Sequence, residues 1–163
     1  MAHMKQAVLR YLIVAGAAFL LIGCGEEPYR VKDFQIVPLM DQAKTVTLAD
    51  FKGKTVLLDF WATTCGPCKE SMPEIQELWD KYHAKGFEVA SISDEPRNLV
   101  LSFHEQSPYT FPVFMDHAHT ANLAYNVDAI PQFVLIKDGR VFWSQVGFQK
   151  GDITREVESV MEG

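Results

Sequence analysis

The residues of this chain best suited to chemistry are two cysteines, Cys65 and Cys68, which are separated by two residues. They lie in the segment DFWATTCGPCKES, directly after the mostly apolar run TVLLDF. A pair with this spacing can bind a metal ion, form an inert disulfide or act as a reversible redox couple. The choice among these depends on the elements that hold the two sulfur atoms.

The pair is expected at the junction of a buried strand, residues 55–60, and a helix. A thiol at a helix N-terminus meets unpaired N–H groups and the positive end of the macrodipole, which stabilise its thiolate. We therefore expect Cys65 to ionise near neutral pH and Cys68, about one turn further on, to be shielded by the helix. Gly66 and Pro67 suit the first turn, because a proline there loses no needed hydrogen bond.

Metal binding and a purely structural disulfide fit the pair less well. A closed zinc site needs four ligands. The third cysteine, Cys24, lies near the N-terminus, and His117 and His119 are distant in sequence with strand-like spacing. No metal site is therefore expected. A disulfide that closes so short a loop constrains the unfolded chain little. Lys69, directly after the pair, either helps to hold the thiolate or is a plain surface charge.

The elements around the pair predict a single α/β domain, because 163 residues with 48% hydrophobic content supply one core. Asp138-Gly139 joins two β-rich runs in a hairpin, and Asp152 is expected to cap a C-terminal helix. Strands that alternate with helices and end in a hairpin indicate a mixed sheet covered by helices on both faces. Further strands are expected at FEVASIS and FPVFMD, and further helices after the cysteines and at residues 97–107 and 118–127.

The net charge of the chain is −6 at neutral pH. Proteins that bind nucleic acids by their phosphates need a cationic surface. The composition therefore argues against a nucleic-acid partner.

The N-terminal segment has the pattern of an export signal. Met-Ala-His-Met at residues 1–4 looks vector-derived, with the natural start at Met4. Lys5 and Arg10 then precede an uncharged apolar run, residues 11–23, which is short for a spanning helix and suits a signal-peptide core. Residues 1–23 are therefore interpreted as a vector-derived start followed by a signal peptide.

The apolar run ends in LIGC, residues 21–24, which resembles the lipobox of bacterial lipoproteins. The resemblance implies that Cys24 becomes the acylated first residue of the mature protein, so that residues 24–33 form a lipid-anchored tether ahead of the domain at 34–163. Plain secretory cleavage is the alternative. Either form of export would place Cys65 and Cys68 in an oxidising compartment, where disulfides persist.

Longer segments around the pair resemble the thioredoxin fold, namely VLLDFWATTCGPCK and AIPQFVLIKDG. The wider pattern is similar to the TlpA/ResA-like branch of membrane-tethered thiol-disulfide oxidoreductases, from about Phe34 to Met161. The resemblance implies that Cys65 is the nucleophile and Cys68 the resolving thiol. It also implies a cis peptide at Ile130-Pro131, with the backbone of Ile130 available to a substrate strand; an ordinary trans proline at the start of a strand is the alternative.

Two further residues near the pair are candidates for the site. Asp59 interrupts the apolar strand, where burial should raise its pKa. By resemblance it is the thioredoxin acid that exchanges protons with the resolving thiol, although a buried aspartate satisfied by hydrogen bonds is the alternative. Trp61 either belongs to the core or lines the rim of the substrate site.

The sequence departs from the branch at two positions. The branch usually carries a glutamate two residues before the helix proline, Pro73, and Ser71 stands there instead. Thr64 replaces the tryptophan that commonly precedes the first cysteine, so a flat aromatic docking surface is lost.

The function expected from these residues is an extracytoplasmic, lipid-anchored thiol-disulfide oxidoreductase that needs no cofactor. The Gly-Pro spacer favours a reductant of exported proteins, and the family implies apocytochrome c among the substrates and a membrane electron donor of the DsbD or CcdA kind. A thiol oxidase or isomerase with the same fold is one alternative. A copper-binding assembly factor that uses both thiols and a histidine is another.

Overall fold

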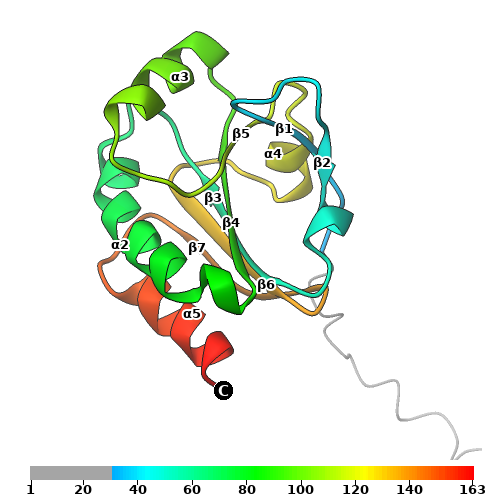
Figure 1. Cartoon of the computed structure of the whole chain (residues 1–163), viewed down its shortest axis with the longest axis vertical. Helices are drawn as coiled ribbons and strands as arrows, with labels where there is room; N and C mark the ends of the chain where they lie inside the picture. Colours follow the sequence, from blue (N-terminus) through cyan, green and yellow to red (C-terminus); the bar gives the residue numbers. More distant parts are fainter. Residues whose placement is uncertain (1–30) are drawn as a thin grey trace, which may run out of the picture.

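The computed structural model describes residues 31–163, which form a seven-stranded sheet with helices packed against it (Figure 1). The strand order is β2-β1-β5-β4-β3-β6-β7. The predicted α/β architecture with a mixed sheet is therefore confirmed. The predicted signal peptide, and the lipidation site at Cys24, lie outside the described residues.

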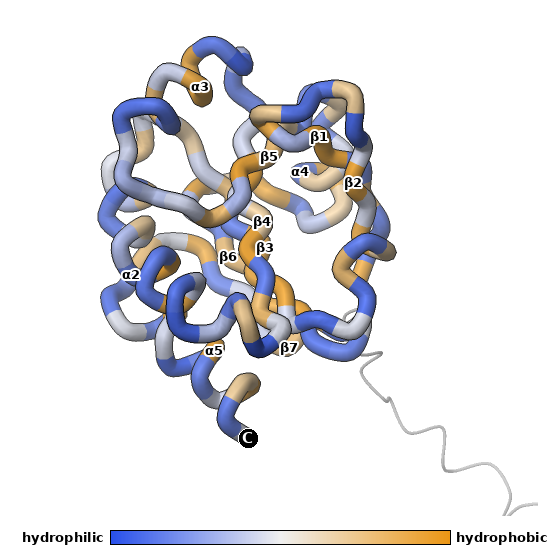
Figure 2. The backbone as a smooth tube through the Cα atoms, in the orientation of Figure 1, coloured by the Kyte–Doolittle hydropathy of each residue, from blue (hydrophilic) through white to orange (hydrophobic). Residues whose placement is uncertain are grey.

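Three long strands form the centre of the sheet: β3 (Thr55–Phe60), β4 (Phe87–Ser93) and β6 (Gln132–Lys137). Strand β3 pairs parallel with β4 and antiparallel with β6. Almost every residue of these strands is buried, because both faces of the sheet centre are covered. Figure 2 shows the apolar residues concentrated along the central strands.

The outer strands complete the sheet on both sides. On one side β5 (Val113–Met115) pairs with β4 and is followed by β1 (Gln35–Pro38) and β2 (Val46–Thr47). On the other side β7 (Arg140–Val146) pairs antiparallel with β6. Positive φ angles of 52° at Asp138 and 71° at Gly139 give the connecting turn the form of a two-residue hairpin. The hairpin predicted from the Asp-Gly dipeptide is thus confirmed.

Helices cover both faces of the sheet, and each face has its own apolar cluster. Helices α2 (Gly66–Tyr82), α3 (Arg97–Gln106) and α5 (Asp152–Met161) contribute to the cluster that contains Leu57 and Cys68. The short helix α4 (Thr120–Ala124) and the 3-10 helix η1 (Leu48–Phe51) contribute to the cluster on the opposite face. The arrangement is visible in Figure 1, where α4 lies across the sheet from α2.

Helix α2 carries the cysteine pair at its N-terminal end. The helix contains Pro73 and passes into a short 3-10 segment, η2 (His83–Lys85). Gly86 then ends the helical path with a φ of 91°, a left-handed conformation that glycine adopts without a Cβ clash. The long helix after the cysteines, and the glycine that stops it, both agree with the sequence pattern.

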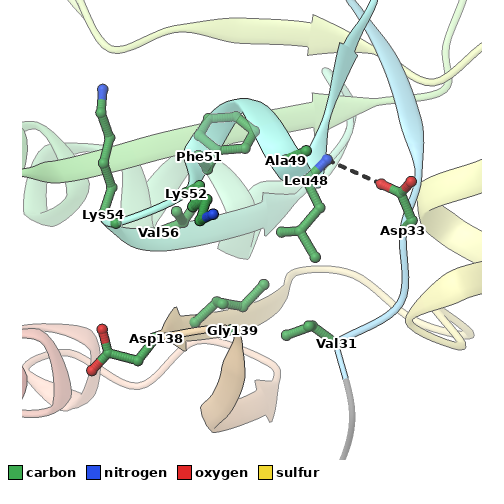
Figure 3. A pocket seen from close by; sticks show the side chains of 12 residues that line it. Val31, Asp33, Leu48, Ala49, Phe51, Lys52, Lys54, Val56, Asp138 and Gly139 are labelled. Carbon is green, nitrogen blue, oxygen red and sulfur yellow. Dashed lines mark hydrogen bonds between the residues drawn. The ribbon is translucent and has the colours of Figure 1, made fainter.

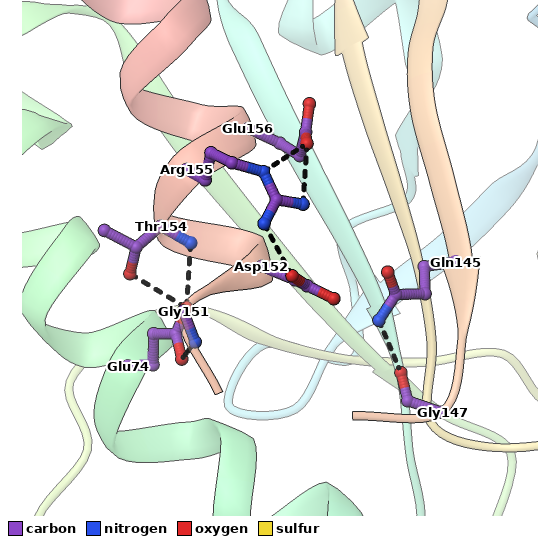
Figure 4. A network of polar contacts seen from close by, with 8 residues as sticks. All are labelled: Glu74, Gln145, Gly147, Gly151, Asp152, Thr154, Arg155 and Glu156. Carbon is purple, nitrogen blue, oxygen red and sulfur yellow. Dashed lines mark hydrogen bonds and ion pairs between the residues drawn. The ribbon is translucent and has the colours of Figure 1, made fainter. Parts of the chain in front are cut away.

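The N-terminus of α5 differs from the expectation. Asp152 is the first helical residue and pairs with Arg155 at 2.7 Å, so the prediction that it caps the helix is wrong. The cap comes instead from Glu74 on α2, whose carboxylate accepts hydrogen bonds from the N–H groups of Gly151, at 3.0 Å, and Thr154, at 2.8 Å (Figure 4). A local sequence pattern could not identify this cap, because it is supplied by a distant helix.

Candidate active site

The two cysteines are bonded to each other at the start of α2. Cys65 is the N-cap residue, and its sulfur accepts a hydrogen bond from the backbone N–H of Cys68 at 3.2 Å. Gly66 and Pro67 occupy the first two helical positions, and the N–H of Lys69 bonds to the Cys65 carbonyl. The sulfur of Cys65 therefore meets a helical N–H group, the setting that stabilises a thiolate once the pair is reduced.

The two sulfur atoms differ in their access to solvent. Cys65 is partly buried, whereas Cys68 is only 1% exposed and belongs to the apolar cluster under α2. A partner protein can therefore reach Cys65 and not Cys68. This asymmetry fits one attacking thiol and one internal resolving thiol.

A cis peptide bond joins Ile130 and Pro131, as the resemblance implied. Strand β6 begins at the next residue, Gln132, which pairs with Phe60 at the end of β3. The cis-proline loop therefore lies beside the end of β3 that leads into the cysteine segment. Ile130 is 40% exposed, so the loop offers an apolar side chain on the surface at this end of β3.

Asp59 is buried on the face of the sheet that α2 covers. Asp59 lies two residues after Leu57 on β3, so both side chains point to the same face of the sheet. Leu57 and Phe133, the residue that pairs with Asp59 on β6, both belong to the apolar cluster under α2. One carboxylate oxygen accepts a hydrogen bond from the Ser91 hydroxyl at 2.9 Å, and the other has no partner among residues 31–163. Loss of hydration raises the pKa of Asp59 to about 7, which the Ser91 hydrogen bond partly opposes. A carboxyl group with this pKa can take up or release a proton near neutral pH.

Trp61 lies in the core rather than on an exposed rim. Its side chain is 3% exposed and packs against Phe103 of α3, with the ring centroids 5.1 Å apart. The same residue lines a small hollow of about 190 Å³, together with Ile130 of the cis-proline loop. Trp61 is thus a core residue that also borders this hollow, and its contribution to substrate binding stays a prediction.

The positions where the sequence departs from the branch have distinct environments. Ser71 is fully buried, and its hydroxyl donates to the carbonyl of Cys68 at 2.8 Å. A small hydroxyl thus fills the place of the branch glutamate and leaves Asp59 as the carboxyl group buried on this face. Thr64 and Lys69 are exposed beside the pair. Within residues 31–163, neither side chain makes a contact that assigns it a role.

Sequence reasoning missed one residue close to the cysteine segment. Glu95 follows β4, and both of its carboxylate oxygens bind Thr63, two residues before Cys65. The only signal in the sequence is an acidic residue just after a buried strand.

A hollow of about 640 Å³ lies at the beginning of β3, the end opposite to the cysteines, between η1 and the β6–β7 turn (Figure 3). Val31 and Leu48 face each other across it, and the N–H of Leu48 donates to Asp33. Within residues 31–163, no three histidine, cysteine, aspartate or glutamate side chains are grouped to hold a metal ion. No helix in this part of the chain is both long and apolar enough to span a bilayer.

Comparison with known proteins identifies the family. A model of the Redoxin family matches residues 28–161. The thiol-disulfide oxidoreductase ResA of Bacillus thuringiensis subsp. konkukian (strain 97-27) is 38% identical over 117 residues, which cover 71% of this chain and 65% of that protein. The chain thus spans just under two thirds of the length of this relative. ResA of Oceanobacillus iheyensis is 34% identical, and the match covers 77% of this chain and 71% of that one.

Solved structures agree with the sequence matches. A protein described as a thiol:disulfide interchange protein DsbE, from Chlorobium tepidum, superposes with a TM-score of 0.75 at 30% identity, covering 82% of this chain and 96% of that one. The exposed lipoprotein thioredoxin Etrx1 of Streptococcus pneumoniae strain TIGR4 gives a TM-score of 0.68 at 25% identity, covering 78% and 99%. The chain therefore belongs to the Redoxin family, in its ResA-like branch with the thioredoxin fold.

Proposed function

We propose that this protein is a thiol-disulfide oxidoreductase in which Cys65 and Cys68 alternate between a dithiol and a disulfide. The observation that carries the proposal is the asymmetric pair at the N-terminus of α2, with an accessible Cys65 bonded to a buried Cys68. The names of the ResA relatives support the same chemistry. Exchange between sulfur atoms needs no cofactor.

The first step is attack by the Cys65 thiolate on one sulfur of a substrate disulfide. A bond forms between Cys65 and that sulfur, the substrate disulfide breaks, and the second substrate sulfur leaves as a thiolate that takes up a proton. The helix N-terminus favours the thiolate form of Cys65 before attack. The backbone of Ile130, before cis-Pro131, is the candidate docking strand for the substrate segment that carries the disulfide.

The second step releases the substrate. Cys68 loses its proton and attacks the sulfur of Cys65, so the Cys65–Cys68 disulfide forms and the substrate leaves with both of its thiols reduced. The protein thereby gives two electrons to the substrate. Asp59 is the candidate acceptor for the Cys68 proton, because it is buried on the same face of the sheet and its pKa lies near 7.

The direction of electron flow in the cell is proposed to be reductive. The Gly-Pro spacer between the cysteines is that of thioredoxin, whose potential is about −270 mV. A reductant in an oxidising compartment must be recharged after each turnover. We therefore assign the recharging step to a membrane electron donor of the DsbD or CcdA kind, and the substrates to disulfides of exported proteins, with apocytochrome c as the leading candidate.

The proposed location is the extracytoplasmic side of a bacterial membrane, with lipid attached at Cys24. The lipobox-like LIGC segment supports this location, as does the description of the pneumococcal relative as an exposed lipoprotein. Several acyl chains hold a protein on a bilayer far better than one, since each buried methylene contributes about 0.8 kcal/mol.

The potential of the purified protein tests the direction of flow. The protein is equilibrated in a series of glutathione redox buffers, and its dithiol and disulfide forms are separated after alkylation. The reduction potential is expected to be about −270 mV. A value of about −120 mV, that of a strong oxidant such as DsbA, would contradict the reductive proposal and favour the oxidase.

The variant Cys68→Ala cannot complete the second step, so it should trap the substrate as a mixed disulfide and identify it.

A further inference from the structure

Glu95 makes a two-point contact with the segment that leads into Cys65. One carboxylate oxygen accepts a hydrogen bond from the backbone N–H of Thr63 at 2.6 Å, and the other accepts from the Thr63 hydroxyl at 2.8 Å. Glu95 is itself held by Ser93, which is 1% exposed: its hydroxyl lies 3.3 Å from both the carboxylate and the backbone N–H of Glu95. A buried side chain at the end of β4 thus supports the carboxylate that holds Thr63.

The residues between β3 and α2 are tied to the end of β4 at two places. The N–H of Trp61 bonds to the carbonyl of Ile92 at 3.1 Å, which continues the β3–β4 pairing by one residue. Thr63 is then held by Glu95, and the N–H of Cys65 closes a turn on the carbonyl of Ala62 at 3.1 Å. Among the contacts of residues 31–163, the bonds from Thr63 to Glu95, two residues beyond β4, therefore hold this segment close to the nucleophile.

We propose that Glu95 is the positioning residue that fixes the Cys65 segment for attack on a disulfide. The inference rests on the proposed thiol-disulfide exchange and goes beyond it by assigning a role to a residue outside the Cys-x-x-Cys motif. In the oxidised protein the Cys65–Cys68 bond also restrains the segment. In the reduced protein that covalent restraint is gone, so the direction of the attacking sulfur depends on the contacts that remain, and Glu95 supplies two of them to Thr63.

Four variants of the full chain separate positioning from charge and from general stability. Glu95→Ala removes both hydrogen bonds. Glu95→Gln removes the charge but keeps the geometry, since its amide oxygen can accept from the Thr63 N–H and its amide nitrogen can donate to the hydroxyl. Thr63→Val removes the hydroxyl bond alone. Glu105→Ala is the matched control, an exposed glutamate on α3.

The readout is the rate constant for reduction of insulin disulfides by each reduced variant, measured well below the melting temperature of its folded form. Misplacement of an attacking group by a fraction of an ångström is costly, so Glu95→Ala is expected to react roughly tenfold more slowly than Glu105→Ala. Glu95→Gln should recover the rate to within about threefold of the unmodified protein, and Thr63→Val should be intermediate.

Three results would overturn the inference. Equal rates for Glu95→Ala and Glu105→Ala would show that the segment holds its position without Glu95. Equal slowing of Glu95→Gln and Glu95→Ala would assign the effect to charge. If Glu95→Ala does not fold, an unchanged rate in Thr63→Val contradicts the inference by itself. Failure of the unmodified protein to reduce insulin would instead contradict the proposed function, so the two failures are distinct.

Discussion

At the scale of single residues, burial of Asp59 lowers the free energy of unfolding by an amount that depends on pH. Its carboxyl group is buried with one hydrogen-bonded oxygen, and its pKa rises from 3.8 to about 7. Between these values the folded chain holds a proton that the unfolded chain has lost. The free energy of unfolding therefore falls as pH rises through this range, by about 4 kcal/mol at most. A carboxyl group retained at such a cost fits a role in proton transfer.

Replacement of Asp59 by asparagine is expected to remove this pH-dependent cost. The oxidised Asp59→Asn variant should be more stable than the unmodified protein at pH 8.5, by up to about 4 kcal/mol, and the difference should vanish near pH 4. Denaturant unfolding at the two pH values measures it, with the exposed Asp80→Asn as control. A gain of equal size at both pH values would contradict the raised pKa.

At the scale of elements, the site depends on contacts that join segments far apart in the sequence. Glu74 of α2 holds the first turn of α5, and the Thr154 hydroxyl adds a further bond to the same carboxylate at 2.8 Å (Figure 4). These bonds attach α5 to α2, the helix that carries the cysteine pair at its N-terminal end. The contact thus links the stability of the C-terminal helix to the position of the reactive pair.

Glu74→Ala should lower the free energy of unfolding by about 1 to 3 kcal/mol, since it leaves two N–H groups at the start of α5 without their charged acceptor. Chemical denaturation of the oxidised protein measures the loss. Glu77→Ala, an exposed glutamate one turn further along α2, is the matched control and should change stability by less than about 0.5 kcal/mol. Similar losses in both variants would show that the cap contributes nothing specific.

The parts of the structure that the sequence predicted are those encoded by local patterns. The runs TVLLDF and FEVASIS coincide with β3 and β4, and the Asp-Gly dipeptide with the β6–β7 turn. The Cys-x-x-Cys spacing located the reactive pair, and the resemblance supplied the cis proline. The contacts of Glu95 and Glu74 could not be predicted, because they join residues brought together only by the folded sheet. The prediction that Asp152 caps α5 is wrong for the same reason, because the cap comes from the distant residue Glu74.

At the scale of the whole molecule, Val31, the first described residue, and the reactive pair lie at opposite ends of β3. Val31 lines the hollow where β3 begins, and Cys65 follows the segment where β3 ends. Six residues of extended strand span about 20 Å. With the anchor proposed at Cys24, residue 31 would lie at the end of β3 opposite to the reactive pair.

The proposed anchor predicts how the protein distributes in a cell. Cys24→Ser removes the only thiol of the lipobox-like segment, so the exported protein should move from the membrane fraction to the soluble extracytoplasmic fraction. Fractionation followed by immunodetection measures the shift, and Cys65→Ser, which leaves the segment intact, should stay with the membrane. Retention of Cys24→Ser on the membrane would contradict lipid attachment at this residue.

The proposed function depends on Cys65 being an accessible, readily ionised thiol once the pair is reduced. The most direct test is the rate of iodoacetamide alkylation at each cysteine of the reduced protein as a function of pH, followed by peptide mass mapping. Cys65 is expected to be modified rapidly at pH 7, with an apparent pKa below the usual 8.5 of a free cysteine, whereas Cys68 should be modified little. A reduced protein whose Cys65 resists alkylation at pH 7, or reacts no faster than Cys68, would contradict the role of Cys65 as the attacking thiol.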